Sequence, residues 1–129
     1  MTPAIDQLLI QARAELVRVE AAALHAEMAG GALVVDTRPA EQRSRDGDLP
    51  GAVVVDRNVL EWRLDPTSPH RIPEATDQGR RIIIVCDEGF SSSLAAATLR
   101  RLGLVQATDL IGGFQAWLRA GDQPEPPVA

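Results

Sequence analysis

Four consecutive β-branched apolar residues, Ile82 to Val85, constrain the fold of this chain more than any other feature. Such an unbroken run is typical of a strand buried on both faces, as in parallel sheets. The run ends at Cys86, and a short loop containing Gly89 leads into an Ala/Leu-rich helix that we expect from Ser92 to Leu102. Because parallel strands need a crossover connection, usually a helix, this segment predicts one strand and one crossover of an α/β sheet.

The rest of the chain alternates between short apolar strands and helical patterns. Strands are expected at 16–19, 32–36, 52–55 and 108–111, and helices at 5–14, 21–28, 39–46, 58–64 and 114–120. The segment 65–76 is predicted as an irregular connection, and 123–127 as an extended, frayed tail. This alternation predicts an α/β fold with a single parallel sheet flanked by helices on both faces.

Two polar side chains stand at the ends of predicted strands. Asp36 ends the strand at 32–36, and Cys86 directly follows the strand that ends at Val85. In parallel sheets the functional loops lie at the carboxyl ends of the strands, so both residues are expected at one edge of the sheet. We expect Asp36, Arg38 and Glu41 to form a structural set that orders the neighbouring loops.

The composition excludes several kinds of chemistry. A net charge of −5 argues against nucleic acid or an anionic membrane as the main partner. All thirteen basic residues are arginine, so lysine chemistry is excluded and an anion site must use arginine, histidine or backbone N–H groups. One cysteine and two histidines do not suffice for a structural zinc site, and no metal or cofactor is expected. A single reactive thiol, with no signal peptide and no long apolar run, predicts the cytoplasm.

The setting of Cys86 predicts a nucleophile. A strand that turns through a short loop into a helix directs backbone N–H groups inward, and the helix N-terminus adds positive partial charge. Such a site holds a thiolate or a bound anion. The alternative is a small buried hydrophobic residue, which is the commoner fate of a free cysteine. The strand–loop–helix setting favours the nucleophile.

Four motifs resemble those of the rhodanese family. Val35-Asp36-Thr37-Arg38 with Glu41 is similar to its Asp-x-Arg element, and Leu49-Pro50-Gly51-Ala52 to its Ile-Pro-Gly-Ala turn. Ile84-Val85-Cys86-x-x-Gly89-x-Ser91-Ser92 resembles the active-site loop, and Gly112-Gly113-Phe114 with Trp117 resembles the closing Gly-Gly-x-x-x-Trp element. The resemblance implies a rhodanese-like domain at 16–121, after a helical extension at 1–15 and before a Pro-rich tail at 122–129.

The resemblance also implies a sulfurtransferase. Cys86 would accept a sulfane sulfur from a small-molecule donor as a persulfide and pass it to a thiol, a cyanide-like acceptor or a protein. The thiolate attacks the outer sulfur of the donor, and the loop N–H groups stabilise the persulfide. The substrate is expected to contact the loop residues Asp87, Glu88, Gly89, Phe90 and Ser91. The alternative function is a non-catalytic rhodanese-like module that senses or docks.

The loop departs from the family pattern in its charge. The family commonly has a basic residue after the cysteine and an arginine two residues beyond the glycine, where this chain has Asp87 and Ser91. The carboxylates of Asp87 and Glu88 repel a dianionic donor such as thiosulfate. They also disfavour the Cys86 thiolate, which the loop N–H groups favour. One of Arg57 and Arg63, which follow the strand at 52–55, is predicted to supply the missing cation to the substrate. The alternative for each, and the commoner fate of such a residue, is a solvated surface arginine.

Two other cysteine chemistries are weighed against this one. A cysteine-dependent phosphatase needs an arginine six residues after the cysteine to clamp phosphate, and this chain has Ser92 there. Neither His25 nor His70 stands in a Cys-His-Asn pattern, which argues against a papain-like hydrolase.

Overall fold

A computed structural model describes residues 1–122 and 124–126, and its centre is a four-stranded parallel sheet. The strands are β1 (Leu33–Asp36), β2 (Val53–Val54), β3 (Ile82–Val85) and β4 (Ala107–Asp109), in the order β2-β1-β3-β4. β1 pairs with β3 over four residues, from Leu33 beside Ile82 to Asp36 beside Val85. Asp36 and Cys86 therefore lie at the same carboxyl edge of the sheet, as predicted.

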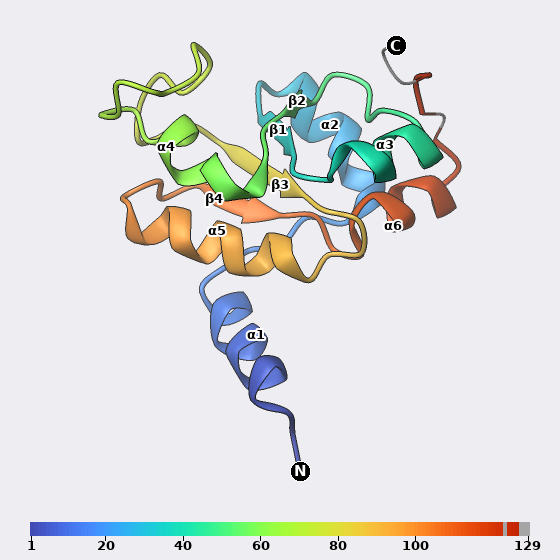
Figure 1. The fold of residues 1–129 in the computed structure, drawn as a ribbon, viewed down its shortest axis with the longest axis horizontal. Coiled ribbons are helices and arrows are strands. Elements are labelled where there is room, and N and C mark those ends of the chain that lie inside the picture. Colours follow the sequence, from blue (N-terminus) through green and yellow to red (C-terminus); the bar gives the residue numbers. More distant parts are fainter. Residues whose placement is uncertain (123, 127–129) are drawn as a thin grey trace.

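Helices cover both faces of the sheet (Figure 1). Ile82 and Ile84 pack with α4 (Leu60–Leu64) and α5 (Ser91–Arg101) on one face. Ile83 and Val85 pack with α2 (Leu24–Ala29) and α6 (Gly113–Arg119) on the other. Successive side chains of a strand point to opposite faces, so an all-apolar strand fits this double burial. The predicted fold class is confirmed.

The remaining elements follow the predicted order with local differences. α3 spans Ala40–Asp46, and short 3-10 turns at Ala21–Ala23 (η1) and Arg57–Val59 (η2) precede α2 and α4. The strand predicted at 16–19 is reduced to one parallel bridge between Val19 and Leu110. The strand predicted at 52–55 keeps only its central residues, because it lies at the sheet edge with one neighbouring strand.

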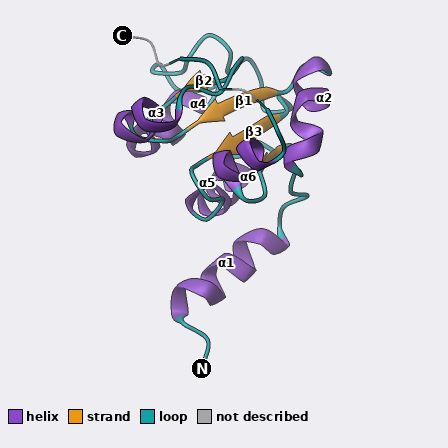
Figure 2. Cartoon of the chain, turned by 90° about the vertical axis from the view of Figure 1, so that its right-hand side faces the viewer, coloured by secondary structure: helices purple, strands orange, loops and turns teal. Residues whose placement is uncertain are grey.

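The first helix, α1 (Ala4–Ala14), lies outside these layers and extends away from the sheet (Figures 1 and 2). It packs against α5. It buries only Leu9 and Ala12. Its place matters for the site, because α5 begins at the loop that follows Cys86.

The tail is held at one point. Asp48 and Glu125 exchange backbone hydrogen bonds of 2.7 and 2.9 Å. The prediction of a frayed end is therefore wrong at Glu125, while residues 123 and 127 of the predicted segment lie outside the described residues. Within the described chain, no helix has the length and apolar character that crossing a membrane requires.

Candidate active site

Cys86 sits at the bottom of the loop between β3 and α5, with 6% of its surface exposed. Two backbone N–H groups point at its sulfur: that of Gly89 donates over 3.2 Å and that of Ser92 over 3.4 Å. Ser92 lies in the first turn of α5, an eleven-residue helix, where backbone N–H groups have no partner within the helix. The sulfur thus lies where the protein stabilises negative charge.

A glycine pair lets α6 approach this loop closely. Gly113 has φ +62°, and a Cβ there would lie 2.5 Å from the carbonyl oxygen of Cys86. Without that Cβ, the backbone N–H groups of Phe114 and Gln115 donate to the carbonyls of Cys86 and Asp87 over 2.9 and 3.0 Å. The start of α6 therefore fixes the first two carbonyls of the loop, which turns the following N–H groups toward the sulfur.

Two arginines hold the other side of the loop. Arg13, from α1, donates to the Gly89 carbonyl over 2.8 Å and to the Ser93 hydroxyl over 3.0 Å. Its guanidinium also lies 5.7 Å from the centre of the Phe90 ring. Arg18 donates to the same Gly89 carbonyl over 3.1 Å. The residue whose N–H contacts the Cys86 sulfur is therefore held through its own carbonyl.

A buried carboxylate organises this side. Asp109, at the end of β4, has no exposed surface and forms a two-point ion pair with Arg18, over 2.8 and 3.1 Å. The hydroxyls of Ser92 and Ser93 donate to its Oδ2 over 2.7 and 2.8 Å. A buried charge is tolerated when it is paired and hydrogen-bonded in this way. The contacts tie the first turn of α5 to β4.

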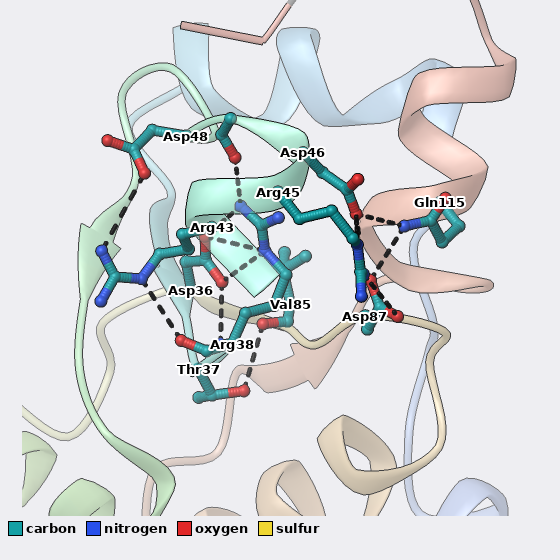
Figure 3. Close-up of polar contacts among 11 residues, drawn as sticks. Asp36, Thr37, Arg38, Arg43, Arg45, Asp46, Asp48, Val85, Asp87 and Gln115 are labelled. Atoms are coloured by element: carbon teal, nitrogen blue, oxygen red, sulfur yellow. Dashed lines mark hydrogen bonds and ion pairs between the residues drawn. The ribbon is translucent and has the colours of Figure 1, made fainter. Parts of the chain in front are cut away.

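The outer side of the loop carries a polar cluster (Figure 3). The Asp87 carboxylate accepts a hydrogen bond of 2.9 Å from Gln115 and lies 3.7 Å from Arg45. Arg45 also pairs with Asp46 over 2.9 Å, and Gln115 donates to Asp46 over 3.0 Å. The Arg45 hydrogen bond is the main cause that lowers the pKa of Asp46. The sequence predicts that no residue of the loop offsets the charge of Asp87, and in the structure the nearby cation is Arg45 from α3.

Asp36 and Arg38 form a buried pair behind the loop. Arg38 donates to Asp36 Oδ2 over 2.9 Å and to the Gly47 carbonyl over 2.9 Å (Figure 3). Its guanidinium also lies 3.5 Å from the centre of the Phe114 ring. The expected structural pair is present. Glu41 was expected to join it but lies exposed on α3, and within the described chain Arg38 makes no hydrogen bond to it.

Two cavities meet at this loop. One of about 320 Å³ contains Cys86 and is lined by Thr37, Arg38, Pro39, Gln42, Cys86, Asp87, Glu88, Phe90 and Ser91. The other, of about 660 Å³, is lined by Arg45, Asp46, Asp87, Glu88, Phe90, Gly112, Gln115 and Arg119. They share three loop residues as a common wall. Among the described residues, no cluster of histidine, cysteine and acidic side chains is suited to hold a metal ion.

The structure does not bring Arg57 and Arg63 to this site. Arg57 pairs with Glu61 over 3.0 Å, one turn along the chain, and Arg63 donates to the carbonyl of His70 over 2.7 Å. Neither is among the described residues that line the two cavities. The sequence predicts them near Cys86 only because they follow the strand at 52–55. The 3-10 turn η2 and the helix α4 instead direct their side chains to Glu61 and to the His70 carbonyl.

Sequence reasoning missed the cations that do reach the loop. Arg13 and Arg18 hold its carbonyl from one side, and Arg45 and Arg119 stand on the other. A signal existed for the last of these. Gln115 and Arg119 are four residues apart on the predicted helix after the Gly-Gly pair, so they share one face of it.

Comparison with known proteins bears on this geometry. The family model for the rhodanese-like domain matches residues 20–120. The adenylyltransferase and sulfurtransferase MOCS3-1 from Zea mays is 33% identical over 96 residues, covering 74% of this chain and 20% of that protein. The chain thus spans about a fifth of the length of that curated relative.

Solved structures match over more of the chain. A Rhodopseudomonas palustris protein of unknown function, described as a possible tyrosine phosphatase, is 33% identical with a TM-score of 0.85, covering 97% of this chain and 96% of that one. A rhodanese homologue from the extremely thermophilic bacterium Thermus thermophilus is 33% identical with a TM-score of 0.56, covering 77% and 98%. A cysteine-dependent phosphatase needs an arginine at the sixth position after its cysteine, and this chain has Ser92 there.

Proposed function

The chain belongs to the rhodanese-like domain family, as its motifs predict, and we propose that it is a sulfurtransferase whose persulfide forms on Cys86. In the first half-reaction the Cys86 thiolate attacks the sulfane sulfur of a donor. A new S–S bond forms at Cys86 and the bond to the donor breaks, so a thiosulfonate leaves as a sulfinate. In the second half-reaction an acceptor thiolate attacks the outer sulfur, and Cys86 leaves as a thiolate.

One observation carries this proposal: the two N–H groups, of Gly89 and Ser92, directed at the Cys86 sulfur. Backbone donors placed where negative charge forms stabilise it without reorganising during the reaction. They suit the thiolate before transfer and the leaving thiolate after it. A merely packed cysteine needs no such donors.

The carboxylates that line the Cys86 cavity bear on which sulfur donors react best. The cavity at Cys86 is walled by Asp87 and Glu88, and only Asp87 has a paired cation in the described structure. We therefore place thiosulfate, a dianion, among the poorer donors, and monoanionic or zwitterionic thiosulfonates among the better ones. The acceptor is a thiol, on a small molecule or on a protein.

Replacing Cys86 by serine tests the function. The swap is nearly isosteric, so the thermal midpoint should change little. Steady-state sulfur transfer from methanethiosulfonate to a thiol should fall to the uncatalysed rate in Cys86→Ser. Full turnover by this variant would exclude Cys86 as the sulfur carrier. No turnover by the wild-type protein with any sulfane donor would instead favour the non-catalytic docking module.

A further inference from the structure

The buried carboxylate of Asp109 is connected to both of the N–H groups that face the Cys86 sulfur. The first connection runs through Ser92, whose hydroxyl donates to Asp109 Oδ2 over 2.7 Å. The backbone N–H of the same serine donates to the sulfur over 3.4 Å. A single residue therefore joins the carboxylate to the sulfur.

The second connection runs through Arg18. Its guanidinium pairs with both oxygens of Asp109 and also donates to the Gly89 carbonyl over 3.1 Å. The backbone N–H of Gly89 donates to the Cys86 sulfur over 3.2 Å. Asp109 thus holds both residues that supply the donors, one directly and the other through an arginine.

The loop needs such support from outside. Gly89 has φ +85°, and a glycine has the least restricted backbone of any residue, so its own conformation does not fix the direction of its N–H group. Asp109 has no exposed surface and is not among the described residues that line either cavity at the loop. It therefore acts on the sulfur only through other residues.

We propose that Asp109 is a positioning residue that keeps the N–H groups of Gly89 and Ser92 directed at the Cys86 sulfur. Donors held in place before the reaction stabilise the thiolate without reorganising. The inference rests on the proposed function, because it assigns what holds the thiolate that attacks in one half-reaction and leaves in the other.

A direct electrostatic role for Asp109 would have the opposite effect on the thiolate. A carboxylate near the sulfur disfavours a second negative charge, and its removal would leave the Arg18 guanidinium unpaired beside the loop. The thiolate would then form at lower pH. Loss of positioning weakens the two hydrogen bonds to the sulfur, so the thiolate would form at higher pH.

The rate of Cys86 alkylation by iodoacetamide, an uncharged reagent, measures thiolate formation when it is followed against pH. Because Cys86 is the only cysteine, the loss of free thiol reports on this residue alone. The midpoint of the profile is the pH at which half of the thiol is thiolate, and the plateau at high pH reports access to the sulfur. The measurement needs neither a sulfur donor nor an acceptor.

Ser92→Ala and Ser93→Ala form a matched pair for this measurement. Both hydroxyls donate to Asp109 Oδ2, over 2.7 and 2.8 Å, and both residues are buried. The backbone N–H of Ser93, however, donates to the Phe90 carbonyl instead of the sulfur. We expect Ser92→Ala to raise the midpoint by about half a pH unit and Ser93→Ala to move it less, with the plateau rates near the wild-type value.

The charged side chains around Cys86 are the same in both serine variants. Arg38, Asp87 and Glu88 line its cavity, and Arg13 contacts the loop from α1. A difference between the midpoints of the two variants therefore reports on the N–H donors.

Asp109→Asn tests the carboxylate itself, and we expect it to raise the midpoint by about one pH unit. Circular dichroism and urea titration show whether this variant folds, and if it does not, the serine pair decides alone. Arg81→Ala is the control for a broken ion pair. It disrupts the two-point pair with Glu27 at the opposite end of β3 from Cys86, and it should keep the wild-type midpoint.

Equal midpoints in Ser92→Ala and Ser93→Ala, or a lower midpoint in a folded Asp109→Asn, would overturn the positioning role. If the midpoints shift as expected but Cys86 never gains sulfur from a donor, the proposed function fails and the role of Asp109 in holding the thiolate stands.

Discussion

The loop after Cys86 has two sides that are built by opposite means. On the buried side, Arg13 and Arg18 donate to the Gly89 carbonyl, and Asp109, with no exposed surface, pairs with Arg18. On the open side, Asp87 is tied to Gln115 and Arg45, while Glu88 faces solvent. Both sides are rich in charge, but only one is shielded from water.

The two sides of the loop differ in how far their charges are exposed to water, and this affects what each side can do. Ionic contacts shielded from water are strong and depend on geometry, so the buried side fixes the N–H groups that face the sulfur. Ion pairs between exposed charges contribute little to the free energy of unfolding, but exposed charges still attract or repel a charged ligand. We therefore propose that the buried side sets the reactivity of Cys86, and that the open side selects what reacts with it.

The largest predicted effect is on the buried side. Arg18→Ala leaves the Asp109 carboxylate buried with only two hydroxyl donors, and we expect a loss of about 3 kcal/mol in the free energy of unfolding. Urea titration of the variant measures it. A loss below about 1 kcal/mol would place this pair with ordinary surface ion pairs and remove the distinction between the two sides.

Arg81→Ala is the matched control for that experiment. Arg81 also makes a two-point pair, with Glu27 over 3.0 and 3.1 Å, but both side chains are about 30% exposed. The expected loss is under about 1 kcal/mol. The Arg81 hydrogen bond lowers the pKa of Glu27, so this contribution is present above the ordinary pKa of a glutamate and disappears as the pH falls through the lowered value.

A smaller effect, on rate more than on stability, is expected at Arg13. Arg13→Ala removes one of the two arginine donors to the Gly89 carbonyl. We expect about a tenfold lower kcat for sulfur transfer with little change in KM, because the loop is less well positioned. Arg101→Ala is the control, since it breaks the 3.5 Å pair with Glu15 between the end of α1 and the end of α5 without touching the loop. Equal losses of kcat in both variants would mean that α1 acts only by packing on α5.

The smallest effect is on the open side and concerns thiosulfate. Glu88→Gln should raise kcat/KM for thiosulfate about two- to fivefold, and Asp87→Asn should raise it less, because Arg45 already offsets the Asp87 charge. The gain should shrink as salt is added. Steady-state kinetics at low and high ionic strength measure both variants, and a larger gain from Asp87→Asn would contradict the assigned pairing.

Much of the fold and the centre of the site could be predicted from the sequence because their causes are local. The run Ile82–Val85 needs burial on both faces, so it specifies a central parallel strand. Cys86 follows that strand directly, and the glycines at 89, 112 and 113 mark where backbones approach. These features depend on neighbours within a few residues.

The supporting charges could not be predicted because their causes are distant. Arg13 reaches a carbonyl 76 residues along the chain, and Arg18 pairs with a carboxylate 91 residues away. No pattern within the segments around Arg13 and Arg18 predicts these long-range contacts. Arg57 is predicted near the site because it follows a strand, but in the structure it pairs with Glu61, one helical turn along the chain.

If Cys86 carries the transferred sulfur, a loading experiment detects that sulfur on the protein itself. The protein is treated with methanethiosulfonate, separated from the donor, weighed intact by mass spectrometry, and weighed again after a thiol is added. Because Cys86 is the only cysteine, we predict that the protein gains the mass of one sulfur atom and that a digest locates it on Cys86. The added thiol should remove this sulfur at the same rate as the persulfide product forms. Catalytic turnover from a protein that never gains this sulfur would show that Cys86 is not the sulfur carrier.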